Sequence, residues 1–169
     1  MSAPYHPPAV PTTGTLDALP SPLLVRGLSV VLPAHDEVET LAEVVRDALR
    51  VGATCAGVLE VIIVDDGSRD GTADVAHALA RAEERVRVVT HPQNLGYGAA
   101  LRSGFQHAQH EWIFYTDSDG QFDLAELPRL LALLGRYDVV TGYRAARRDG
   151  HVRSAFGAAF SAAVNHLLG

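Results

Sequence analysis

The chain has 169 residues, of which 47% are apolar, and a formal net charge of −6 at pH 7. This length suits one α/β domain rather than two, and the apolar share excludes global disorder. The acidic balance gives no sign of the basic stripe that nucleic-acid-binding proteins carry, so we expect no nucleic acid among the partners. All 14 basic residues are arginine, which excludes any mechanism that requires a lysine.

Signals for targeting and oxidation are sparse. The single cysteine, Cys55, excludes an internal disulfide. The sequence shows neither a run of about 18 apolar residues nor the basic and apolar start of a signal peptide. We therefore expect a cytoplasmic location, with peripheral contact at the inner face of the membrane if the protein acts on a lipid.

The N-terminal 26 residues contain six prolines and show no apolar periodicity. We expect residues 1–26 to form a flexible Pro-rich tail and residues 27–169 to form one domain. Further along, short β-branched runs predict strands, and amphipathic spacing predicts helices. The expected strands are residues 28–32, 61–64, 86–89, 112–115 and 139–140. The first expected helix begins near residue 41 and stops at Gly52. A second runs through residues 75–79 after a cap at Asp70 or Thr72, and two more span residues 99–108 and 123–134.

Alternating strands and helices predict a parallel sheet with right-handed crossovers. Ligands bind such sheets at the carboxyl ends of the strands. Polar clusters follow four expected strands directly, at residues 33–37, 65–68, 117–121 and 141–144. Carboxylates that meet at one edge repel one another unless a cation or hydrogen-bond donors compensate them. The sequence therefore predicts a ligand site at this edge.

Asp117 and Asp119 are one residue apart, so in a turn both can face one cation. Mg²⁺ and Mn²⁺ prefer such oxygen ligands and complete their coordination with water and substrate phosphates. Taken alone, the segment 117–120 is also typical of a surface turn whose aspartate caps the next helix, and 65–68 of a helix-entry turn. The presence of three other polar clusters at strand ends favours the metal site over these turns.

Four segments, in their order and spacing, resemble family 2 glycosyltransferases: residues 31–37, 63–72, 94–100 and 117–123. The last two segments, with Gln121 two residues beyond the acidic motif, are most similar to the dolichol-phosphate mannose synthase and polyprenyl-phosphate glycosyltransferase branch. The resemblance covers about residues 28–150. It implies an α/β, three-layer, Rossmann-like GT-A nucleotide-diphospho-sugar transferase fold with a mainly parallel sheet. The family continues beyond the residue that matches Gly169, so we expect a chain truncated before its acceptor part.

The resemblance also assigns roles to individual residues. Those expected around the nucleoside are Pro33, His35, Glu37, Val64 and Asp66. Those expected at the diphosphate are Asp117, Ser118, Asp119, Gln121 and Arg144, with Asp117, Asp119 and Gln121 at the metal and the two aspartates as catalytic residues. His35 stands where the branch often has tyrosine, which predicts stacking on the base. Asp65 is expected to turn away from the nucleoside, and Asp36 to cap the first helix.

The implied reaction is inverting transfer of a sugar from GDP-mannose or a UDP-hexose to an acceptor, with Mg²⁺ or Mn²⁺ as cofactor. A polyprenyl or dolichyl phosphate acceptor is already anionic near neutral pH and needs no protein base. One alternative is a nucleotide-sugar-binding module without transfer activity. A haloacid-dehalogenase-type phosphatase is disfavoured, because Gln121 stands where a threonine is wanted and lysine is absent. Residues 153–168 are also predicted to form an amphipathic element that packs on protein or rests on a membrane.

Overall fold

A computed structural model describes residues 24–142. The chain divides into two units, with the boundary between Ala132 and Leu133. The first unit holds all the regular elements named below. In the second, the described residues show one isolated β-bridge, between Leu134 and Tyr137.

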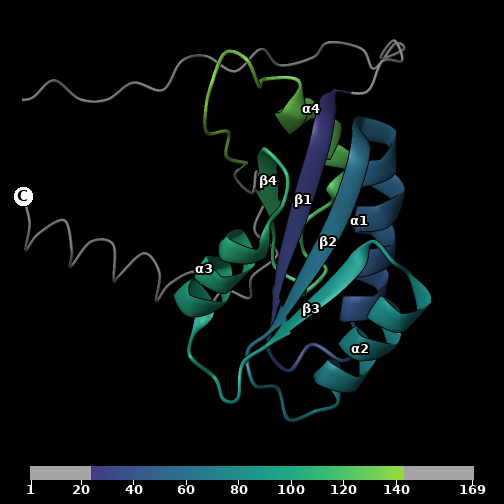
Figure 1. The fold of residues 1–169 in the computed structure, drawn as a ribbon, viewed down its shortest axis with the longest axis vertical. Helices are drawn as coiled ribbons and strands as arrows, with labels where there is room; N and C mark the ends of the chain where they lie inside the picture. The colour runs from purple at the N-terminus through teal and green to yellow at the C-terminus, as the bar shows by residue number, and fades with distance from the viewer. Residues whose placement is uncertain (1–23, 143–169) are drawn as a thin grey trace, which may run out of the picture. The chain divides into compact units, whose positions relative to one another are not determined.

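Four parallel strands form the sheet of the first unit, in the order β3-β2-β1-β4 (Figure 1). The two central strands are β1 (Val25–Ala34) and β2 (Ala56–Asp65). They are flanked by β3 (Val86–Thr90) and β4 (Trp112–Tyr115). The register sets the strand ends side by side, because Ala34 pairs with Asp65 and Asp65 pairs with Thr90.

Helices cover both faces of this sheet and complete three layers (Figure 1). On one side, α1 (Leu41–Cys55) packs on β1 and β2, and α2 (Thr72–Ala82) packs on β2 and β3. On the other side, α3 (Tyr97–His107) packs on β1 and β2. A 3₁₀ turn, η1 (Leu124–Glu126), and the short α4 (Leu127–Leu131) follow β4 and contact α1.

The core lies around the central strands, whose last seven residues are all buried. Burial on both faces explains why these segments read as continuous β-branched runs rather than as alternating patterns. One glycine sets how closely α3 approaches: a Cβ at Gly104 would collide with the Val31 side chain. Val31, Ile62, Val64 and Ala100 form one buried cluster under this helix.

The strand order creates a switch point. The chain moves outward from β1 through β2 to β3 on one side and then returns through α3 to place β4 against β1. The connections on either side of β1 therefore leave toward opposite faces of the sheet. In open parallel sheets, the crevice at the carboxyl ends beside such a reversal is where ligands bind.

The described elements confirm four predicted strands, although β1 begins at Val25, inside the predicted tail, and α1 runs past Gly52 to Cys55. The predicted fifth strand is wrong: residues 139 and 140 form no strand, and Val139 is 78% exposed. Two valines give too short a ladder to hold a strand without a paired neighbour. The predicted helix 123–134 is divided into η1 and α4, because the Asp123 carboxylate accepts a hydrogen bond from Ala125 N and Pro128 stands in the first turn of α4.

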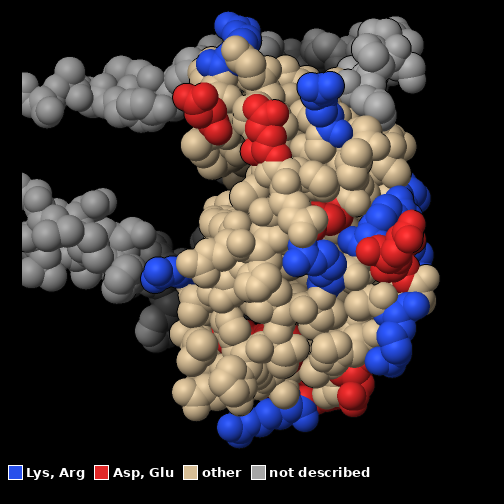
Figure 2. Space-filling model, viewed as in Figure 1, with Lys and Arg blue, Asp and Glu red and all other residues tan. Residues whose placement is uncertain are grey.

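The remaining N-terminal tail and the predicted amphipathic segment 153–168 lie outside the described residues. Between residues 24 and 142, no helix has the length and apolar character needed to cross a membrane. Basic and acidic side chains are interspersed over the face that Figure 2 shows.

Candidate functional site

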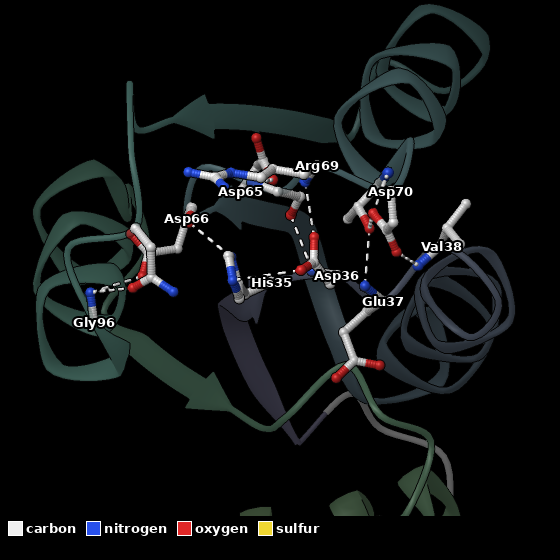
Figure 3. A network of polar contacts seen from close by, with 12 residues as sticks. His35, Asp36, Glu37, Val38, Asp65, Asp66, Arg69, Asp70 and Gly96 are labelled. Atoms are coloured by element: carbon white, nitrogen blue, oxygen red, sulfur yellow. Dashed lines mark hydrogen bonds and ion pairs between the residues drawn. The ribbon is translucent and has the colours of Figure 1, made fainter.

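The loop after β1 is fastened to the loop after β2 by Asp36 (Figure 3). Its carboxylate accepts a 2.7 Å hydrogen bond from the Arg69 backbone N–H, and its own N–H donates to the Ser68 hydroxyl at 3.1 Å. Asp36 has a positive φ of 56°, a conformation that aspartate tolerates better than most residues. The prediction that it caps the first helix is wrong, because Thr40 is the N-cap of α1 and the Asp36 side chain reaches across to the neighbouring loop.

The next residues continue this connection toward α2. The Glu37 N–H donates to the Thr72 hydroxyl at 2.8 Å, and the Val38 N–H donates to Asp70 at 3.1 Å. Asp70 also accepts from the Thr72 N–H at 2.9 Å. The predicted cap at Asp70 or Thr72 is wrong, because Gly71, with a φ of 100°, is the N-cap of α2 and Asp70 stands one residue before it. The two loops therefore present one connected rim (Figure 3).

Asp66 connects the end of β2 to the loop before α3. Its carboxylate accepts hydrogen bonds from Leu95 N at 2.9 Å, Gly96 N at 2.8 Å and His91 Nδ1 at 2.7 Å. Burial by itself would raise the pKa of Asp66, but the hydrogen bonds from Leu95, His91 and Gly96 outweigh it and hold that pKa below its ordinary value. The carboxylate is therefore ionised near neutral pH. Its backbone carbonyl meanwhile lies 2.9 Å from His35 Nδ1.

The acidic turn after β4 is anchored to β1 by hydroxyl groups. The Ser118 hydroxyl donates to the Pro33 carbonyl at 2.6 Å, and the Thr40 hydroxyl donates to the Ser118 carbonyl at 2.7 Å. The Gln121 N–H donates to Asp119 Oδ1 at 2.9 Å and tightens the turn. These contacts set Asp117 and Asp119, on either side of the buried Ser118, at the switch point.

Tyr97, the first residue of α3, reaches toward this turn. Partial desolvation, a hydrogen bond to Asp117 and the negative charges of Asp117 and Asp119 raise the pKa of its hydroxyl above the ordinary value. The hydroxyl is therefore protonated and can donate to the carboxylate. This contact joins the start of α3 to the acidic turn.

A pocket of about 640 Å³ lies among these segments, a size that suits a small-molecule ligand. It brings together seven residues that the resemblance assigned to the site: Pro33, His35, Glu37, Asp66, Asp117, Ser118 and Asp119. Asp65 is buried, accepts a hydrogen bond from Ser68 N and is not among the residues that line the pocket. All four segments that line the pocket belong to the first unit.

Two predicted site residues are not among those that line the pocket, and a third lies outside the described residues. Val64 is fully buried in the cluster under α3, where it packs with Ala100 of the pocket wall. Gln121 is exposed and is not among the lining residues. Arg144 lies outside the described residues. Contacts of these three residues with substrate or metal stay predictions.

The donor set fits a hard divalent cation in part. Asp117 and Asp119 both line the pocket, and their carboxylate oxygens are the ligands that Mg²⁺ and Mn²⁺ prefer. No cluster of three or more His, Cys, Asp or Glu side chains with metal-binding geometry occurs within residues 24–142. Two carboxylates are compatible with Mg²⁺ chemistry in which substrate phosphates and water complete the coordination.

The pocket wall also contains Asn94 and Gly96, for which the family resemblance favours a role in shaping the donor pocket over an ordinary loop. Three more wall residues, Ala34, Tyr97 and Ala100, had no role assigned from the sequence. For Tyr97 the available signal was its place in the glycine-bearing loop at residues 94–98, since loops that precede a helix at this sheet edge line the crevice. Nothing in the spacing marked His91, which lies behind the pocket against Asp66.

Comparison with known protein families shows to which family the chain belongs. The model of the family "Glycosyl transferase family 2" matches residues 29–161. The chain belongs to this family. The predicted membership is thus confirmed.

Relatives of known name are similar over most of this chain. The undecaprenyl-phosphate 4-deoxy-4-formamido-L-arabinose transferase of Pseudomonas syringae is 35% identical over 133 residues, which cover 76% of this chain and 39% of that protein. Glycosyltransferase AglD of Haloferax volcanii is 35% identical over 121 residues, which cover 69% of this chain and 19% of that protein. The chain thus spans 39% of the length of the first relative. The predicted similarity to the polyprenyl-phosphate branch is confirmed.

Solved structures confirm the three-layer α/β GT-A fold. A mannosyltransferase from Pyrobaculum calidifontis, in complex with GDP-Man and Mn²⁺, superposes with a TM-score of 0.54 at 22% identity, over 63% of this chain and 32% of that one. Glucosyl-3-phosphoglycerate synthase from Mycobacterium tuberculosis superposes with a TM-score of 0.52 at 29% identity, over 64% of this chain and 41% of that one. The latter enzyme has also been solved with Mn²⁺, UDP and glucosyl-3-phosphoglycerate.

Proposed function

We propose that this chain forms the donor-binding part of an inverting, metal-dependent hexosyltransferase. Its donor would be GDP-mannose or a UDP-hexose, and its acceptor a polyprenyl or dolichyl phosphate. The observation that carries the proposal is the pocket at the switch point, where the Asp66 carboxylate and the Asp117–Asp119 pair line one cavity. Relatives named for undecaprenyl-phosphate transfer support the acceptor class.

The two ends of the pocket would bind different parts of the donor, the nucleoside at one end and the diphosphate at the other. His35 and Asp66 would hold the nucleoside, with the imidazole stacked on the base and the carboxylate accepting a hydrogen bond from the base or ribose. Pro33 and Glu37 line the same pocket and would complete this end. The hydrogen bonds from Leu95 N and Gly96 N to the Asp66 carboxylate support this role, because they fix the carboxylate before a ligand binds.

Asp117 and Asp119 would hold the diphosphate through Mg²⁺ or Mn²⁺, with Gln121 as a third contact carried over from the family. When bound, the cation supplies the positive charge that stabilises a departing nucleoside diphosphate. Ser118 keeps the two carboxylates together through its bond to the Pro33 carbonyl. Arg144 would add a bidentate phosphate contact. The Mn²⁺ in two neighbouring structures supports a divalent cation at this site.

Transfer itself would need no base from these residues. A lipid phosphate carries an anionic oxygen near neutral pH, so it can attack the anomeric carbon directly, opposite the leaving diphosphate. The protein's task is then to orient the two reactants, which can lower a barrier by about 7–11 kcal/mol in the best cases. This single displacement inverts the anomeric configuration.

A thermal-shift screen tests the proposal. We expect GDP-mannose, UDP-glucose or UDP-N-acetylglucosamine to raise the Tm in the presence of Mn²⁺ or Mg²⁺, because ligands that bind only the folded state stabilise it. Donor hydrolysis and transfer to a polyprenyl phosphate, measured in parallel, separate an enzyme from a module that only binds. No stabilisation by any of the nucleotides would contradict the proposal.

A further inference from the structure

A buried chain of hydrogen bonds runs behind the pocket, through residues of three different elements. His91, directly after β3, is 8% exposed. Its Nδ1 lies 2.7 Å from Asp66 Oδ1, and its Nε2 lies 2.8 Å from the Ser103 hydroxyl on α3. The backbone fixes His91 as well, because its N–H donates to the Asp65 carbonyl at 2.8 Å.

The chemistry of these three groups gives the chain one direction when the imidazole of His91 is neutral. An ionised carboxylate only accepts hydrogen bonds, so Nδ1 of His91 carries the proton and donates it to Asp66. In a neutral imidazole Nε2 is then the acceptor, and the Ser103 hydroxyl donates to it. The order is Ser103 to His91 to Asp66.

This order determines how Asp66 faces the pocket. A carboxylate has about four acceptor positions, and three of those on Asp66 are used by His91, Leu95 N and Gly96 N. Two of the three lie on Oδ1 and one on Oδ2. The remaining acceptor position therefore belongs to Oδ2 of a residue that lines the pocket.

We propose that His91 is a positioning residue for the nucleoside end of the donor, acting through Asp66, with Ser103 fixing its tautomer. This inference rests on the proposed function, since it requires Asp66 to bind the nucleoside. His91 holds Oδ1 so that Oδ2 is presented to the ligand. The same contact steadies the loop at Leu95 and Gly96, which depends on the carboxylate for its N–H partners.

Two substitutions separate the two nitrogens of the ring. The amide nitrogen of asparagine stands close to the position of Nδ1, and that of glutamine close to the position of Nε2. His91→Asn therefore keeps a donor for Asp66, whereas His91→Gln keeps only the side that faces Ser103. His77, exposed on α2, gives the control His77→Gln.

The assay compares two ligands by calorimetry, both with Mn²⁺: UDP or GDP, and inorganic pyrophosphate. We expect His91→Gln to weaken nucleoside diphosphate binding roughly tenfold, about the contribution of one hydrogen bond to a charged group, with pyrophosphate unchanged. His91→Asn should restore most of the affinity, and His77→Gln should bind like the wild type. Urea unfolding of each variant accounts for changes in stability.

Four results would overturn the inference. The first two concern His91→Gln: nucleoside diphosphate binding as tight as that of the wild type, or loss of pyrophosphate binding by the same factor, which indicates a purely structural role. A wild-type chain that binds no nucleoside diphosphate removes the proposed function and this inference with it. Independently of any ligand, ¹⁵N shifts of His91 should report the Nδ1–H tautomer, and the Nε2–H tautomer would contradict the direction of the chain.

Discussion

Gly67 offers the sharpest test of how the loops around the pocket are built. It stands between Asp66 and Ser68 with a φ of +67°, and a Cβ there would lie 2.6 Å from Asn94 N. The Gly67→Ala substitution therefore pushes the loop that carries Leu95 N and Gly96 N away from the Asp66 carboxylate.

The expected magnitude has two parts. An alanine in left-handed backbone costs about 1–2 kcal/mol. Loosening one of the two backbone hydrogen bonds to the charged Asp66 adds about 1.5–3 kcal/mol. We expect Gly67→Ala to lower the free energy of unfolding by roughly 3–5 kcal/mol in total and to weaken nucleotide binding as well.

Gly71 provides the matched control. Its φ of +100° imposes a backbone penalty of the same kind, but the nearest atom to a Cβ is Val38 Cγ2 at 3.8 Å. Gly71→Ala should therefore cost only about 1–2 kcal/mol in urea unfolding and leave nucleotide affinity intact. Equal losses in the two variants would refute the argument that packing against residues 93–94 holds the Asp66 loop in place.

Two further predictions concern carboxylates. Asp119→Ala should abolish metal-dependent nucleotide binding in calorimetry, whereas Asp36→Ala should change it much less, since Asp36 bonds the neighbouring loop rather than lining the pocket; equal losses would show that the wrong carboxylates were chosen. Glu60→Gln should lower stability near neutral pH by about 1–3 kcal/mol, because Glu60 accepts hydrogen bonds from Ser29, Gln109 N and Arg87. Burial would raise the pKa of Glu60, but these bonds lower it overall, so its contribution is present above the unfolded pKa and is lost as pH falls through the folded one. Urea midpoints of both proteins against pH should converge in acid, and a gap that stays constant would contradict this account.

The sequence predicted the sheet well because its strands are buried on both faces. Strands of this kind appear in the sequence as continuous β-branched runs, as in Val61–Val64, whereas a strand with one exposed face alternates apolar and polar residues. The same signal failed at Val139 and Val140, where two apolar residues carry no information about whether a neighbouring strand exists. Strand ends were harder to place, since β1 begins at Val25, whereas the proline-rich composition placed residues 1–26 in the predicted tail.

The candidate site was predictable to the extent that it depends on strand ends. Parallel strands bring their carboxyl ends to one edge, so the residues after β1, β2 and β4 meet whatever the details of the loops. Contacts between loops were not predictable in this way. Asp36 bonds Arg69 across 33 positions, and His91 meets Ser103 only because α3 packs on β2, the strand beside β3. Neither pair has a spacing that marks it in the sequence.

The measurement that tests the central claim most directly is a calorimetric titration of this chain with UDP and with GDP, each in Mn²⁺ and in excess EDTA. Asp117 and Asp119 face the pocket as a pair of carboxylates, so a diphosphate should be repelled unless a cation lies between them. We expect binding of at least one nucleotide in Mn²⁺ and its loss in EDTA. Undiminished affinity in EDTA, or no binding under either condition, would contradict the account.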